Sequence, residues 1–149
     1  MTEFEKILIG KICPYCKCET ELVSGKIIFG QSSKYGGMYY RCKINPDHYV
    51  GTYKDGIKSL GSLADKELRE WRSKGHSNFD PLWKEKPKFF RSKWNAYEWL
   101  SKVMGVERRY AHFGMFSIEQ CEKSIFECIE LKRKINNLTC TKKSTSEQS

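Results

Sequence analysis

The segment Cys13-Pro-Tyr-Cys16, together with Cys42-Lys-Ile-Asn-Pro-Asp-His48 further along the chain, decides the fold of the N-terminal part of this protein. Two cysteines separated by two residues form a tight turn that presents both thiolates to one point. A second pair from a facing turn completes a tetrahedral Zn²⁺ site. The first pair has this spacing, whereas in the second pair a histidine replaces the second cysteine at a longer spacing.

We therefore predict a structural zinc site with the ligands Cys13, Cys16, Cys42 and His48. Zinc favours soft thiolate donors, and a neutral imidazole is a good fourth ligand if the Asn-Pro-Asp segment before His48 forms a turn. Cys18 is the alternative fourth ligand, although it would compete with Cys16 for the same side of the ion. A site with three protein ligands and a water, or no metal site, is the remaining alternative. With four side-chain ligands, no position stays open for chemistry, so the expected role is structural.

Thioredoxin-type redox sites have the same Cys-x-x-Cys spacing, but in them the second cysteine enters the long helix of a βαβ unit. Here Lys17-Cys-Glu-Thr20 leads into strand-like sequence, which favours metal binding. Cys121 and Cys128 lie on the apolar stripe of the last expected helix, and we predict that both pack in a core.

Short apolar and aromatic runs separated by turn residues predict β-hairpins between Lys11 and Tyr53. The expected strands contain Ile27-Ile-Phe29, Met38-Tyr-Tyr40 and Tyr49-Val-Gly-Thr-Tyr53. A Cys-x-x-Cys turn followed by such hairpins is the layout of a zinc ribbon.

Helical signals replace this pattern after Gly61. Capping residues and helix-compatible prolines predict helix starts at Ser62, Asp80, Ser92 and Ser117. The predicted fold is therefore α+β, with N-terminal zinc-ribbon β-hairpins packed with three to four C-terminal helices. We expect a zinc-ribbon-like module over residues 1–58, a helical segment over residues 59–135 and a disordered tail over residues 136–149, with the last helix ending near Lys134.

The chain carries a net charge of +9, from 27 basic and 18 acidic residues. The surplus is concentrated in residues 61–110, which hold twelve basic and seven acidic residues. Such a balance favours polyanionic partners, with nucleic acid expected first and anionic membrane surfaces second. Ordinary solubility explains the same surplus, so charge alone does not decide the function.

The segment from Lys84 to Trp94 combines five basic residues with three aromatic ones. Cations neutralise phosphates and aromatic faces stack on unpaired bases, so this segment is the candidate nucleic-acid interface, with DNA expected ahead of RNA. The alternative is a solvated linker whose aromatic side chains anchor the core. The candidate contact residues are Lys84, Lys86, Lys88, Phe89, Arg91, Lys93, Arg108 and Arg109.

Other functions have weaker support in the sequence. His76, Asp80 and His112 are candidates for a catalytic arrangement, but helix capping and helix-to-loop hydrogen bonds explain these residues more simply, and no small-molecule substrate is evident. The charged N-terminus does not resemble an export signal, and no apolar run approaches the ~18 residues of a membrane span. We therefore expect a cytoplasmic protein.

Several segments, in order along the chain, resemble a small bacterial and phage family that is described as a zinc-finger-containing domain of unknown function. The resemblance spans about Cys13 to Ile129, and its segments are Cys13-Pro-Tyr-Cys16, Tyr49-Val-Gly51, Leu60–Arg69, His76–Trp83, Ala96–Leu100 and His112–Cys121. It implies a zinc ribbon joined to a helical segment in one compact unit, and it implies no activity. Family members usually have a second cysteine-rich turn before Tyr-Val-Gly, where this chain has Cys42 and His48.

Taken together, these features predict a zinc-binding protein that binds nucleic acid as an accessory factor of a bacterial phage or mobile element. The alternative is a protein–protein interaction module, such as a binder of a host or defence protein, in which the zinc is purely structural.

Overall fold

The computed structural model describes residues 1–34, 36–86 and 89–148, with side chains described through Leu138. The chain forms two compact units. Unit 1 comprises Met1–Arg72 with Phe113–Met115, and unit 2 comprises Ser73–His112 with Phe116–Ser149. A three-stranded sheet and several helices confirm the predicted α+β class. The predicted division at residues 58 and 59 stays a prediction.

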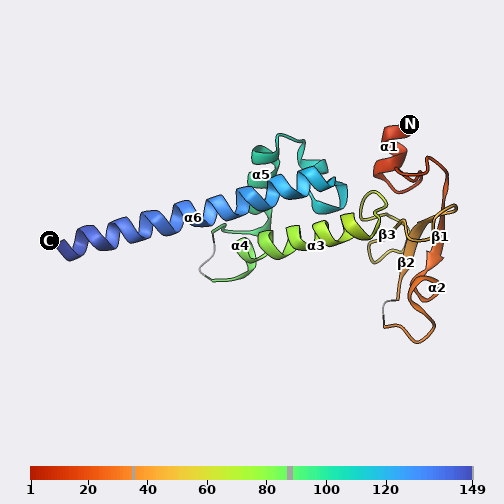
Figure 1. Ribbon diagram of the computed structural model, residues 1–149, viewed down its shortest axis with the longest axis horizontal. Helices are drawn as coiled ribbons and strands as arrows, with labels where there is room; N and C mark the ends of the chain where they lie inside the picture. The colour runs from red at the N-terminus through yellow and green to blue at the C-terminus, as the bar shows by residue number, and fades with distance from the viewer. Residues whose placement is uncertain (35, 87–88, 149) are drawn as a thin grey trace. The chain divides into compact units, whose positions relative to one another are not determined.

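The sheet of unit 1 consists of β1 (Thr20–Ser24), β2 (Met38–Cys42) and β3 (Tyr49–Gly51), all antiparallel and in the order β1-β2-β3 (Figure 1). In the register, Thr20 lies opposite Cys42. The end of β2 is therefore beside the start of β1, so Cys42 lies close to the loop that carries the other cysteines.

The predicted strand at Ile27-Ile-Phe29 is wrong, because these residues belong to the short helix α2 (Gly25–Phe29). Ser24 caps this helix by accepting a hydrogen bond from the Lys26 amide, and Gly30 ends it with a φ of 103°. The Phe29 ring packs edge-on against Tyr39 and Tyr49, with centroid distances of 5.3 and 5.8 Å. Tertiary packing and a cap thus override the strand propensity of isoleucine.

Two further helices, α1 and α3, differ from the expected ones. The capped helix α1 (Glu3–Leu8) was not predicted. Helix α3 (Lys66–Phe79) begins after Asp65, whose Oδ1 accepts the Leu68 amide, so Asp65 and not Ser62 is its cap. Ser62 is buried instead, and its hydroxyl accepts a hydrogen bond from the Arg72 side chain at 2.8 Å.

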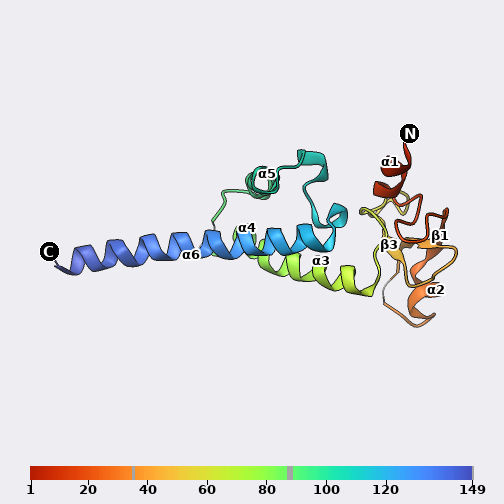
Figure 2. The same cartoon turned by 45° about the horizontal axis from the view of Figure 1, so that its top comes forward.

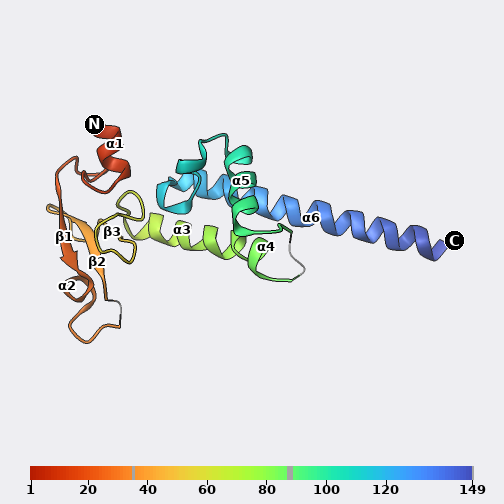
Figure 3. The ribbon, with the colours of Figure 1, turned by 180° about the vertical axis from the view of Figure 1, so that it is seen from behind.

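Unit 2 contains α4 (Pro81–Lys84), α5 (Lys93–Met104), the 3₁₀ turn η1 (Arg108–Tyr110) and α6 (Ile118–Gln148), and Figure 3 shows α5 beside α4 and α6. The turn η2 (Phe113–Met115) belongs to unit 1.

The expected caps are confirmed at Ser92 and at Ser117, as is the left-handed Gly105 that ends α5. Buried side chains form the core of unit 2, among them Phe79, Leu82, Ala96, Leu100, Phe116, Cys121 and Cys128. Both cysteines therefore pack in a core, as predicted.

Helix α6 runs on to Gln148, past the expected end near Lys134, and so covers most of the segment whose composition predicts a disordered tail (Figure 2). Adding residues to a helix whose first turns are already packed needs no new nucleation, so weak helix formers can continue it. The side chain of Cys140 lies outside the described residues. Within the described part of the chain, no helix has both the length and the apolar character needed to cross a membrane.

Candidate metal centre

The first half of the centre is the turn that begins at Cys13. The Cys16 amide points at the Cys13 sulfur, with an N–S distance of 3.5 Å, and the Lys17 amide donates to the Cys13 carbonyl at 2.9 Å. Lys17 closes the turn in the left-handed region with a φ of 59°, and the Cys13 amide then donates to the Cys18 carbonyl at 2.9 Å. This backbone path holds both cysteine side chains on one side of the turn.

The second half follows β2 and repeats the same backbone device. The Asn45 amide donates to the Cys42 sulfur at 3.3 Å, as the Cys16 amide does to the Cys13 sulfur. Asn45 Oδ1 accepts the Asp47 amide at 3.0 Å, and the Cys42 amide donates to the His48 carbonyl at 2.9 Å. The predicted Asn-Pro-Asp turn therefore exists, and it brings His48 back beside Cys42.

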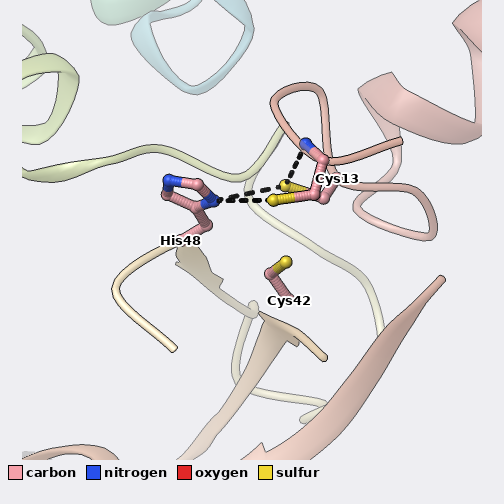
Figure 4. Close-up of side chains that lie close together, drawn as sticks. Cys13, Cys42 and His48 are labelled. Atoms are coloured by element: carbon pink, nitrogen blue, oxygen red, sulfur yellow. Dashed lines mark hydrogen bonds between the residues drawn. The ribbon is translucent and has the colours of Figure 1, made fainter. Parts of the chain in front are cut away.

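The four predicted ligands converge on one point. One ligand atom from each of Cys13, Cys16, Cys42 and His48 lies within 4.8 Å of all the others. His48 Nδ1 is 3.5 Å from the Cys13 sulfur and 3.8 Å from the Cys16 sulfur, and Figure 4 shows the imidazole directed toward Cys13, with the Cys42 sulfur nearby. A tetrahedral ion with Zn–S of ~2.3 Å and Zn–N of ~2.0 Å requires S–N separations of roughly 3.5 Å. The side chains are thus already spaced to hold zinc.

Burial and hydrogen bonding give the three thiols different acidities in the metal-free protein. Burial raises the pKa of Cys13, and desolvation together with the neighbouring thiols raises the pKa of Cys16 to about 11. Burial also raises the pKa of Cys42, but hydrogen bonds from the Asn45 and Ile44 amides outweigh it and bring the pKa to about 6. Cys42 is therefore the thiol that is already a thiolate near neutral pH, and zinc must displace protons from the other two.

Two side chains that sequence reasoning missed position His48. The Tyr15 ring lies against the imidazole with a centroid distance of 4.3 Å, and its hydroxyl accepts the Asp65 amide at 3.2 Å. Arg69 of α3 donates to the carbonyl of Asp47 at 2.6 Å and to its carboxylate at 2.8 Å. The guanidinium also lies 4.0 Å from the centroid of the Tyr49 ring. These contacts tie the His48 loop to the first turn and to α3.

The donor set fits zinc in a structural role. Three thiolates and one imidazole are the ligands that zinc favours, and they fill all four tetrahedral positions. Cys13 and Cys42 are 0% and 1% exposed, and they form one buried cluster with Val50 and Leu63. A bound Zn²⁺ supplies the cross-link that a small, partly polar sheet lacks. The chain therefore binds zinc structurally.

Cys18, the alternative ligand, lies beside this set and is not one of the four. Its sulfur is 3.4 Å from the Cys42 sulfur, and its side chain is half-buried against the same cluster. The geometry favours His48 over Cys18 because the imidazole contacts both sulfurs of the first turn.

The candidate nucleic-acid residues that the structure describes all belong to unit 2. Lys84, Lys86, Arg91 and Lys93 are exposed, Phe89 and Arg108 are half-buried, and Arg109 is exposed but paired with Glu107 at 2.8 Å. Lys88 lies outside the described residues. Their role in binding stays a prediction.

The three candidate catalytic residues are His76, Asp80 and His112. His76 Nδ1 is 3.4 Å from Asp80 Oδ2, one helical turn away, and the same carboxylate oxygen is 4.0 Å from the Lys84 ammonium. Asp80 is thus shared by two partly exposed side chains, His76 and Lys84, each four residues away, an arrangement typical of a solvated helix end. His112 is half-buried just before η2.

Comparison with known proteins gives one family. A family model described as a zinc-finger-containing domain matches residues 9–131, which include both halves of the metal centre and most of unit 2. No curated protein and no solved structure matches the chain significantly. The match covers most of the sequence and agrees with the convergence of the four ligands. The chain belongs to this family of zinc-finger-containing domains.

Proposed function

We propose that the protein binds nucleic acid through a basic–aromatic face of unit 2. We define this face by its rings, Trp83, Trp94 and Tyr97, and its cations, Lys84, Lys93 and Arg108. The expected partner is DNA ahead of RNA, and zinc keeps its structural role in unit 1.

The observation that carries the proposal is a continuous chain of cation–π contacts. Both Lys84 and Lys93 lie over the Trp83 ring, with ammonium-to-centroid distances of 5.1 and 5.3 Å. Lys93 also reaches the Tyr97 ring at 6.0 Å, and Arg108 lies over the rings of Tyr97 and Trp94 at 4.8 and 5.2 Å. Residues from α4, α5 and η1 therefore form one connected surface of alternating charge and aromatic area.

Such a surface suits a nucleic-acid backbone with accessible bases. The cations can neutralise phosphates, and the aromatic faces can stack on bases without requiring a particular sequence. Trp94 is 62% exposed although it is large and apolar, and Arg108 occupies the space beside its ring. An exposed indole next to a guanidinium is a stacking platform, and burying it against a base offsets the cost of keeping it in water.

The proposal is tested by fluorescence anisotropy with labelled single-stranded and duplex DNA and with RNA, each across a range of salt concentrations. The wild type is expected to bind with an affinity that falls steeply with salt. The triple variant Lys84→Ala, Lys86→Ala, Lys93→Ala loses two cations of the face, Lys84 and Lys93, and the neighbouring exposed Lys86. Its salt slope on duplex DNA should be shallower by about 2 to 3, since each phosphate contact contributes ~0.9.

A charge-matched control separates a local interface from general attraction. The triple variant Lys11→Ala, Lys26→Ala, Lys54→Ala removes the same charge from exposed positions of unit 1 and should leave the slope unchanged. Equal losses in both triple variants, or an absence of binding at low salt, would reject the proposed face. The second outcome would favour the alternative, a protein-interaction module. The accessory role in a phage or mobile element stays a prediction of the sequence.

A further inference from the structure

The metal centre contains one thiol more than zinc needs. The four ligands are complete without Cys18, yet the Cys18 sulfur lies 3.4 Å from the Cys42 sulfur, in hydrogen-bonding contact. The Cys18 carbonyl accepts the Cys13 amide at 2.9 Å, so its backbone is fixed by the first turn. Cys18 is thus held against a zinc ligand without being one.

We infer that Cys18 and Cys42 form a reversible redox pair, in which oxidation by a hydroperoxide joins the two sulfurs as a disulfide and removes Cys42 from the zinc site. Two features favour this pair over the ligand pair Cys13 and Cys16. Cys18 is half-buried and uncoordinated, so an oxidant can reach a sulfur whose electrons are not shared with the metal. The second feature is distance, since the Cys42 sulfur, which completes the disulfide, already contacts the Cys18 sulfur.

The chemistry balances with one hydrogen peroxide. The Cys18 sulfur attacks a peroxide oxygen as its thiol gives up its proton: an S–O bond forms, the O–O bond breaks, and the departing hydroxide takes that proton to become water. The Cys42 sulfur then attacks the sulfenic acid of Cys18, so that the S–S bond forms while the S–O bond breaks, and the departing hydroxide takes a proton from solvent and leaves as a second water. The two sulfurs together supply the two electrons that reduce the peroxide.

The position of the pair in the sheet determines what oxidation changes. Thr20 lies opposite Cys42 in the β1–β2 ladder, and Cys18 stands just before β1. The disulfide therefore links the two strands at the end where they already pair, and the ladder can persist. The first turn keeps Cys13 and Cys16, and the loop keeps His48, but three ligands hold zinc less tightly than four. Oxidation should thus release zinc while leaving β1 and β2 joined.

The experiment treats the zinc-loaded full-length protein with hydrogen peroxide, follows zinc release with a colorimetric chelator and maps disulfides by mass spectrometry. Wild type should release one zinc per chain, yield a peptide joined through Cys18 and Cys42, and reload zinc after thiol reduction. Cys18→Ser should release zinc about tenfold more slowly, since zinc-bound thiolates then have no adjacent free thiol. Cys128→Ser is the matched control, because this thiol is 1% exposed in the core of unit 2.

Three results would overturn the inference. The first is zinc release from Cys18→Ser at the wild-type rate, and the second is a mapped disulfide between Cys13 and Cys16 in place of the proposed one. The third is a Cys18→Ser protein that holds less than one zinc per chain before oxidation, which would make Cys18 a ligand. A normal zinc content combined with slow release supports the inference, and it does so independently of any nucleic-acid binding.

Discussion

Replacing Arg69 with alanine removes the side chain that connects α3 to the loop carrying His48. Its guanidinium donates to the carbonyls of Asp47 and Ala64, both at 2.6 Å, and to the Asp47 carboxylate at 2.8 Å. It also lies 4.0 Å from the Tyr49 ring centroid. All of these contacts stay within unit 1, and the variant loses all of them at once.

The expected cost follows from the exposure of these groups. Each hydrogen bond to a carbonyl contributes ~1 kcal/mol net. The ion pair adds only ~0.5 kcal/mol, because the Asp47 side chain is 54% exposed. Stacking on Tyr49 adds ~0.5 kcal/mol, and the rotamer freedom that the long side chain regains on removal offsets part of the total. Arg69→Ala should therefore destabilise unit 1 by about 2 kcal/mol.

Because zinc binding and the ordering of the His48 loop are coupled, this cost should appear in the metal affinity as well as in the stability. About 2 kcal/mol corresponds to roughly a 30-fold weaker zinc affinity. Competition against a chelator of known affinity measures the first effect, and thermal unfolding of the zinc-loaded protein measures the second. Arg69→Lys should recover less than half of the loss, since an ammonium cannot reproduce the planar fork of donors.

The control is Arg133→Ala on α6, which removes one exposed ion pair with Glu130 and nothing near the metal. This variant should match wild type within experimental error. If Arg69→Ala and Arg133→Ala have the same zinc affinity and the same midpoint of unfolding, the assignment of Arg69 as an anchor of the His48 loop is wrong.

The other predictions concern the ligands and one backbone contact. His48→Ala should weaken zinc binding at least about 100-fold, and unchanged zinc content by elemental analysis would contradict its role as a ligand. Zinc affinity should rise with pH by about two log units per pH unit near neutrality, because zinc must displace protons from Cys13 and Cys16, the two thiols with raised pKa values. Below the Cys42 pKa of about 6, zinc must displace a third proton, so the dependence should steepen by about one more log unit per pH unit. Chelator competition measured across this pH range checks both slopes. Gly61→Ala should destabilise unit 1 by more than ~2 kcal/mol in denaturant titrations, since φ is +153° and an added Cβ would overlap the Gly114 carbonyl. Gly105→Ala, at a left-handed position with open space, should cost only ~1 kcal/mol in the same titration.

Features that depend on a few neighbouring residues could be predicted from the sequence. The spacing of Cys13 and Cys16, the cap at Ser92 and the left-handed stop at Gly105 are local devices, and the structure contains each of them. In each case the residue type and its partner lie within one turn of chain. A sequence pattern therefore contains nearly all of the residues that determine these features.

Helix α2 shows where such patterns fail. A helix of one turn is too short to have a hydrophobic period, and two adjacent isoleucines favour a strand by propensity. The helix forms because Ser24 caps it and because the Phe29 ring packs against Tyr39 and Tyr49, which are distant in the sequence. That contact depends on the pairing of β2 with β3, so it cannot be inferred before the sheet is known.

The second half of the metal centre, from Cys42 to His48, has one feature set by neighbouring residues and one that depends on residues distant in the sequence. The spacing of Cys42 and Asn45 is that of a Cys-x-x-Cys turn, and the Asn45 amide donates to the Cys42 sulfur as the corresponding amide does in the first turn. The backbone of the turn is thus preserved, and only the ligating atom is displaced to His48. A ligand on a longer loop has more conformational freedom to lose, and the contacts from Tyr15 and Arg69 restrict that loop before zinc arrives. Sequence alone identified His48 as a candidate ligand, but it could not show the two distant side chains that make this ligand competitive with a nearby thiol.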